Sequence, residues 1–211
     1  MTDDLKKLQL RALQYWLVDG VGELNVGFFF LLVAIVYSLQ ESAPGSLLSK
    51  IFSIASVLLV CGGAFGVRWI IQRIKERTTY PRTGYIAYKS GWKNKGDVAI
   101  AIGVMALFLA FVVFTMVTDT KLTDWVPVVC GLFMGAFLVQ TGYRSALPRF
   151  YILAFLSLLI GAGLVASGLS IVFSLPLFFG LNGLILLTSG SLTLWNYLRQ
   201  TPAPQDTPDE H

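Results

Sequence analysis

Long apolar runs, separated by short polar stretches, make up most of this chain. A helix of about twenty apolar residues matches the hydrocarbon core of a bilayer. The run at residues 98–118 fits this requirement well, since it contains no charged side chain. The pattern predicts an all-α polytopic membrane protein with six transmembrane helices, at about residues 21–39, 51–71, 98–118, 126–143, 150–172 and 177–198.

The segments outside these runs have a different composition. Residues 1–20 can place apolar side chains on one helical face and charged ones opposite, which predicts an interfacial amphipathic segment or a simple lead-in to the first span. Residues 199–211 are rich in proline and acidic residues, which predicts a disordered tail. Within the last apolar stretch, Ser174 and Pro176 predict the break between the fifth and sixth helices.

The overall composition supports the membrane interpretation. Hydrophobic residues form 55% of the chain and charged residues only 13%, with a mean hydropathy of +0.68. Soluble domains are usually about a quarter charged, so this chain has too little polar surface to cover a water-exposed globule. The 211 residues leave no room for a separate soluble domain beside six spans.

The distribution of basic residues predicts the orientation. Half of the sixteen lysines and arginines fall in residues 68–97, and fourteen of the sixteen lie on one side of the predicted topology. Only Lys50 and Lys121 lie on the other side. By the positive-inside rule the basic side is cytoplasmic, so we expect a multi-pass protein of the bacterial inner membrane with both termini in the cytoplasm.

Residues 68–97 also combine their cations with aromatic rings. Topology alone explains most of this charge, but cations beside amphipathic rings also suit a surface that binds anionic lipid headgroups, a phosphate or a protein partner. The candidate residues for such binding are Arg77, Tyr80, Arg82, Tyr85, Tyr88 and Lys89.

A few polar residues fall at or inside the predicted spans. Asp19 and Glu23 are four residues apart and share a helix face. They could favour the positive end of the helix dipole, pair with an arginine on the same membrane side, or form a proton or cation site. The arginines considered for this pair are Arg68, Arg73 and Arg144.

Two amides lie deeper in the later spans. Gln140 and Asn182 could bond across helices or, together with Glu23, line a transport path. Close helix packing is predicted where glycines recur at a spacing of four. The residues with this spacing are Gly62, Gly66, Gly131 and Gly135.

Several classes of enzyme are disfavoured by the residues themselves. The sole histidine, His211, lies in the predicted tail, so a Ser-His or Cys-His pair has no base in the apolar region. Two distant cysteines do not form a zinc cluster, and the basic residues flank apolar runs instead of forming a nucleic-acid surface. We therefore expect a non-enzymatic membrane-complex subunit, or a protein that binds anionic lipid or a partner, without a cofactor. It would associate with a membrane-protein partner or form a homo-oligomer. The alternative is a small transporter or channel, and a membrane enzyme that acts on lipid comes third.

The segment YPRTGYIAYK at residues 80–89 resembles a set of uncharacterised bacterial multi-pass membrane proteins that carry a similar arginine-rich loop. The segment DGVGEL at residues 19–24 adds to this resemblance. The resemblance implies a multi-pass membrane fold and carries no known activity.

Overall fold

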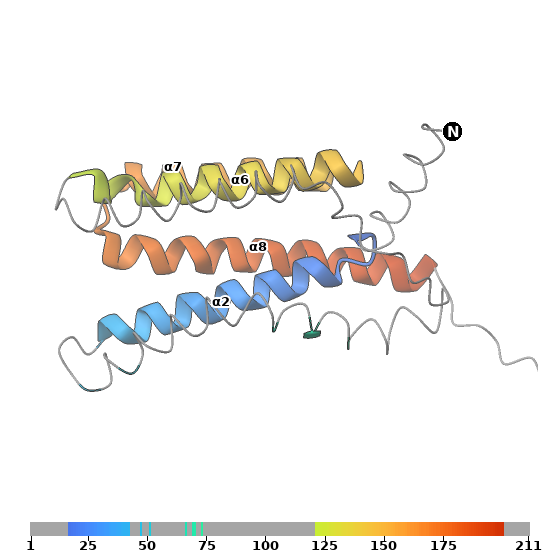
Figure 1. Ribbon diagram of the computed structural model, residues 1–211, viewed down its shortest axis with the longest axis horizontal. Helices are drawn as coiled ribbons and strands as arrows, with labels where there is room; N and C mark the ends of the chain where they lie inside the picture. Colours follow the sequence, from blue (N-terminus) through green and yellow to red (C-terminus); the bar gives the residue numbers. More distant parts are fainter. Residues whose placement is uncertain are drawn as a thin grey trace, which may run out of the picture.

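A computed structural model describes residues 17–42 and 121–200 together with six single positions between them. The described residues contain helices and no strand, as Figure 1 shows. The helices are α2 (Val21–Ser42), the 3-10 helix η1 (Lys121–Trp125), α6 (Val126–Ser145), α7 (Arg149–Ala166) and α8 (Ile171–Gln200). The single positions are Leu47, Ile51, Gly66, Trp69, Ile70 and Arg73.

Four of these helices are long and apolar enough to cross a membrane. For the described part of the chain, the prediction of an all-helical fold with apolar helices long enough to span a membrane is therefore confirmed. The predicted spans at 51–71, apart from four single positions, and at 98–118 lie outside the described residues. The same holds for residues 1–16 and 201–211, so the predicted interfacial segment and most of the tail stay predictions.

Helices α2 and α8 run antiparallel with their backbones almost in contact. A Cβ on Gly27 would lie 2.8 Å from the carbonyl oxygen of Gly183, and one on Gly183 would lie 2.9 Å from that of Gly27. Only glycine permits so close an approach. Further along, the rings of Phe30 and Phe179 meet edge to face, with centroids 5.4 Å apart. The two helices thus form one closely packed pair.

Helices α6 and α7 form a second antiparallel pair. Ala146, with a left-handed φ of 54°, begins the short turn between them. A Cβ on Gly161 would lie 2.6 Å from the carbonyl oxygen of Pro127, and one on Gly131 would lie 3.0 Å from that of Ser157. Gly135 packs against the Leu158 side chain in the same interface.

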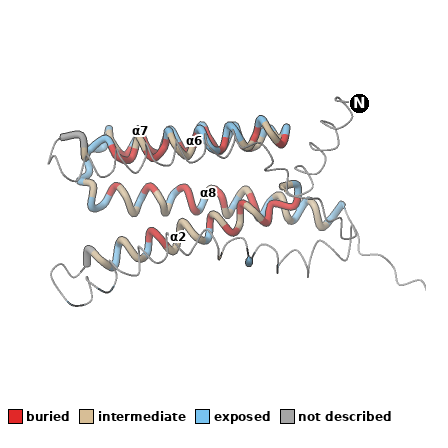
Figure 2. The backbone as a smooth tube through the Cα atoms, in the orientation of Figure 1, coloured by how far each residue is buried: buried red, intermediate tan, exposed pale blue. Residues whose placement is uncertain are grey.

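The two pairs meet through side chains. In Figure 1, α8 lies between α2 and the α6/α7 pair. Leu186 packs with α6 and α7 residues in one apolar cluster, and Phe178 does so in a second. Figure 2 shows the buried residues along the sides of the helices that face one another. Contact between the pairs is therefore looser than the glycine contact within each pair.

The boundary between the last two helices differs from the predicted one. Helix α7 ends at Ala166, α8 begins at Ile171, and Pro176 lies inside α8. Gly168 has a φ of +65° and donates its N–H to the Val165 carbonyl oxygen, which is the way a glycine ends a helix. Pro176 is tolerated because only about one turn of helix precedes it, so few backbone hydrogen bonds of the helix are lost.

Candidate functional site

A tight turn leads into α2 and presses against α8. The Asp19 side chain, fully buried, accepts a hydrogen bond from the Val21 N–H at 3.2 Å. Gly20 has a φ of +71°, and a Cβ there would lie 2.6 Å from the Gly190 carbonyl oxygen. Both the backbone conformation and the lack of space require glycine here. The turn fixes where the first residues of α2 lie.

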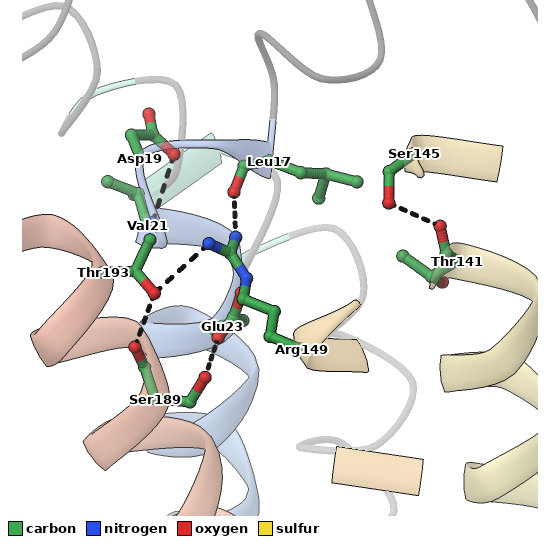
Figure 3. A network of polar contacts seen from close by, with 9 residues as sticks. All are labelled: Leu17, Asp19, Val21, Glu23, Thr141, Ser145, Arg149, Ser189 and Thr193. Atoms are coloured by element: carbon green, nitrogen blue, oxygen red, sulfur yellow. Dashed lines mark hydrogen bonds and ion pairs between the residues drawn. The ribbon is translucent and has the colours of Figure 1, made fainter. Parts of the chain in front are cut away.

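In the first turn of α2, Glu23 is buried against two other helices, with only 5% of its surface exposed. The Ser189 hydroxyl of α8 donates a hydrogen bond to Glu23 Oε2 at 2.5 Å. Arg149 Nε of α7 lies 2.8 Å from Glu23 Oε1. These two atoms are not aligned as a hydrogen bond, so we interpret the contact as an ion pair. Figure 3 shows the three side chains converging.

Arg149 is the residue that joins the elements. Its terminal nitrogens donate to the Leu17 carbonyl oxygen and, at 3.2 Å, to the Thr193 hydroxyl. Thr193 in turn donates to the Ser189 carbonyl oxygen at 2.8 Å. One guanidinium therefore contacts the turn before α2, helix α2 and helix α8. We call Glu23, Arg149, Ser189 and Thr193 the clasp.

The clasp lies at one end of the bundle. The first turns of α2 and α7 meet there with the last turns of α6 and α8. A carboxylate near the first turn of α2 favours the positive end of that helix. Arg149 is the first residue of α7. The N-terminus of α7 is also the positive end of its helix dipole, which is unfavourable for a cation, and the nearby Glu23 carboxylate offsets this repulsion. The pair is neutral as a whole, which suits a region of low dielectric.

The clasp can hold charge and exchange a proton, but it does not resemble a metal site. Among the described residues no three His, Cys, Asp or Glu side chains come close enough to hold a metal ion. Glu23 has its cation supplied by the protein itself. What the arrangement can do chemically is lock helices together and respond to the charge on Glu23.

In the described structure Glu23 pairs with Arg149, which is none of the three arginines considered from the sequence. Of these three, Arg68 lies outside the described residues. Arg144 lies in the last turn of α6, which packs on α7 and α8. The guanidinium of Arg73 lies over the Trp69 ring at 4.8 Å. Arg149 reaches Glu23 because α7 starts beside the end of α8. The sequence offered one indication for Arg149: it directly follows Pro148 and lies on the same predicted membrane side as Glu23.

The other polar candidates are not gathered around Glu23. Asn182 is buried but donates to the Phe178 carbonyl oxygen of its own helix at 2.9 Å. Gln140 lies exposed on α6. Ser189 and Thr193, which do contact the clasp, were missed from the sequence because hydroxyls in an apolar helix usually bond to their own backbone.

The glycines proposed as packing positions have different surroundings. Gly131 and Gly135 lie in the α6/α7 interface. No described atom lies within 4 Å of where a Cβ on Gly66 would be. Gly62 lies outside the described residues, as do the candidate headgroup- or partner-binding residues Arg77, Tyr80, Arg82, Tyr85, Tyr88 and Lys89.

The end of the bundle that holds the clasp also carries exposed aromatic residues. Tyr143 near the end of α6 is 80% exposed and Trp195 near the end of α8 is 59% exposed. The Arg199 guanidinium lies over the Trp195 ring at 4.6 Å.

Comparison of the chain with protein-family models, curated proteins and solved structures found no match.

Proposed function

We propose that this chain is a multi-pass protein of the bacterial cytoplasmic membrane, with six spans and both termini in the cytoplasm. The directions of the described helices support this topology. Helix α2 ends, and η1 and α6 begin, at the end of the bundle far from the clasp. The chain between them therefore crosses the membrane an even number of times, and the apolar runs at 51–71 and 98–118 supply two crossings.

The charges and rings of the described helices support the orientation. Arg144, Arg149 and Arg199 lie at the clasp end, whereas η1 at the far end carries one basic residue, Lys121, and one acidic residue, Asp124. Basic residues collect on the cytoplasmic side, and exposed Tyr143 and Trp195 suit the adjoining interface. The proposal assigns the clasp end to the cytoplasm.

Cysteine labelling tests the topology. In a variant with Cys61 and Cys130 replaced by alanine, a cysteine placed at Ser42 should react in intact cells with a membrane-impermeant maleimide. A cysteine placed at Ser90 should react only after the cells are opened. Equal labelling of both positions in intact cells would contradict the proposed topology.

Within this topology we propose a non-enzymatic role, in which the helical bundle anchors a basic cytoplasmic segment that binds anionic lipid headgroups. The observation that supports this proposal is that the two charged residues of the clasp pair with each other. Glu23 and Arg149 neutralise each other, and the buried Asn182 bonds to its own backbone. These charged and amide groups of the described interior thus bond within the protein itself, and we propose surface charge as the means of interaction.

Lipid retention by the purified protein tests this role. The test variant removes three cations around YPRTGY, namely Arg77, Arg82 and Lys89, by substitution with glutamine. The control removes equal charge elsewhere in the segment, at Lys75, Lys93 and Lys95. Each cation near an anionic surface contributes about 1 kcal/mol, so both variants should weaken general attraction.

A binding site at YPRTGY predicts that the test variant retains at least tenfold less phosphatidylglycerol in native mass spectrometry than the control variant does. Equal retention by the two variants would mean that the charges of this segment set the membrane orientation and form no specific lipid site. If lipid retention is unchanged but a co-purifying protein is lost, the segment binds a protein partner and not lipid.

A small transporter is the second candidate, because an ionisable side chain buried in a span often marks an ion path. Glu23 is such a residue. Transport through this site predicts flux in proteoliposomes that falls in a Glu23→Gln variant. Absence of flux across a panel of ions and small solutes would remove this candidate.

A further inference from the structure

The bundle consists of two units that are held together in different ways. Within each unit, glycines bring two backbones into contact, as at Gly27 with Gly183 and at Gly161 with Pro127. Between the units, the contacts are made by side chains of α8 against α6 and α7. Two helices whose backbones are in direct contact stay together, whereas helices that meet through side chains can slide past one another by small amounts. Each pair can therefore move as a rigid body.

The contact between the units differs from one end to the other. At the far end, Val126, Leu164 and Phe178 form an apolar cluster. Toward the clasp end, Phe150 of α7 and Leu186 of α8 belong to another apolar cluster. There Arg149 of the α6/α7 pair also reaches Glu23 and Thr193 of the α2/α8 pair. Helices α2 and α7 make few close backbone contacts, so the Arg149 side chain spans the distance between them. The polar link is thus confined to one end.

We propose that the Glu23–Arg149 pair is a proton-operated latch between the two helix pairs. A proton on the Glu23 carboxylate removes the only negative charge that contacts Arg149 in the described structure. The guanidinium then keeps only neutral oxygen atoms, those of Leu17 and Thr193. An uncompensated arginine at the edge of a membrane span moves outward toward the headgroups. The α6/α7 pair then separates from α2/α8 at the clasp end, with the far end as the hinge.

The surroundings of Glu23 allow both of its charge states. Ser189 donates to the ionised carboxylate, and the same hydroxyl oxygen can accept the proton of the neutral acid. Besides Arg149, the charged group of the described chain that acts on Glu23 is Asp19, in the turn before α2. Helix α8 faces Glu23 with neutral hydroxyls, and α6 packs on α7 and α8. The latch is independent of what the basic segment binds.

Spin-label distances in lipid nanodiscs test the latch on the folded chain. In the cysteine-free variant, labels at Tyr143 of α6 and Leu192 of α8 report on the separation of the two units at the clasp end. Labels at Phe28 of α2 and Leu184 of α8 report within one unit. All four side chains are more than half exposed, so the labels should disturb packing little.

Lowering the pH from about 8 to about 4 covers the range in which carboxyl groups titrate. The latch predicts that the Tyr143–Leu192 distance shifts by several ångströms to longer values, while the Phe28–Leu184 distance stays constant. A Glu23→Gln variant should show the longer distance already at the upper pH. An Asp19→Asn variant should keep the response of the unmodified chain.

Three results would overturn the latch. The Tyr143–Leu192 distance could be the same at both pH values, or both distances could lengthen together, which would indicate general unfolding. Loss of the pH response in Asp19→Asn would assign the titration to Asp19. Because the pH series uses the native Glu23, it decides the question even if Glu23→Gln does not fold. A failure here leaves lipid retention by the basic segment unaffected.

Discussion

The contact between α2 and α8 can be tested with a single methyl group. In Gly183→Ala the new Cβ would lie 2.9 Å from the Gly27 carbonyl oxygen and 3.1 Å from the Leu31 backbone nitrogen. Ordinary contacts of this kind begin at 3.4 Å, so the helices must separate by about half an ångström. Because these neighbours are backbone atoms, they cannot rotate away. Overpacking of this kind reduces stability by about 1–3 kcal/mol.

Gly163→Ala is the matched control. Gly163 lies on α7, and no described atom lies within 4 Å of where its Cβ would be. The added methyl group meets no described neighbour and favours the helix by about 0.5–1 kcal/mol. The two variants carry the same chemical change in the same kind of helix, so they isolate the effect of the interface.

Reversible unfolding in mixed micelles with a rising fraction of dodecyl sulfate measures both variants. Gly183→Ala should unfold at a lower fraction, with an unfolding constant raised by a factor of about 5 to about 140, since about 1.4 kcal/mol corresponds to tenfold. Gly163→Ala should unfold at the same or a higher fraction than the unmodified chain. If Gly183→Ala is as stable as Gly163→Ala, the two backbones are not in contact.

The other predictions concern the turn before α2 and the hydroxyl that contacts Glu23. Gly20→Ala should lower the free energy of unfolding by at least about 1–2 kcal/mol from backbone conformation alone, while Gly22→Ala, whose nearest neighbour atom would lie 3.9 Å away, should have little effect in the same unfolding assay. Ser189→Ala removes a hydrogen bond to a charged group and should cost about 1.5–3 kcal/mol. The adjacent Thr188→Ala, an exposed position, should stay within about 0.5 kcal/mol of the unmodified chain; equal losses for Ser189→Ala and Thr188→Ala would contradict the contact.

The helices themselves were predictable because the bilayer imposes a length and a composition on them. The apolar runs at 126–143 and 177–198 indicate α6 and α8, although α8 begins six residues earlier. That error has a physical cause. Pro176 was interpreted as a helix break, but near a helix start a proline removes little, whereas Gly168 in a left-handed conformation ends α7.

The site was predictable only in part. Glu23 is conspicuous because a carboxylate in an apolar run is rare. Its partner was not predictable, because the choice between arginines depends on which helices pack together. The close approach of α2 and α8 depends on Gly27 and Gly183. Gly183 lies seven residues from Gly190 of the same helix, and Gly27 lies seven residues from Gly20 in the turn before α2, instead of four. The four-residue spacing indicates the α6/α7 interface and misses this one.

A double-mutant cycle between Glu23 and Arg149 tests the central claim most directly. Removing one member of a buried ion pair leaves the other uncompensated and costs about 3–5 kcal/mol. Glu23→Gln and Arg149→Gln should each lower the free energy of unfolding in mixed micelles by about this amount. The double variant should lose clearly less than the two losses combined, because neither charge is left alone. Strictly additive losses would contradict a clasp between the two helix pairs.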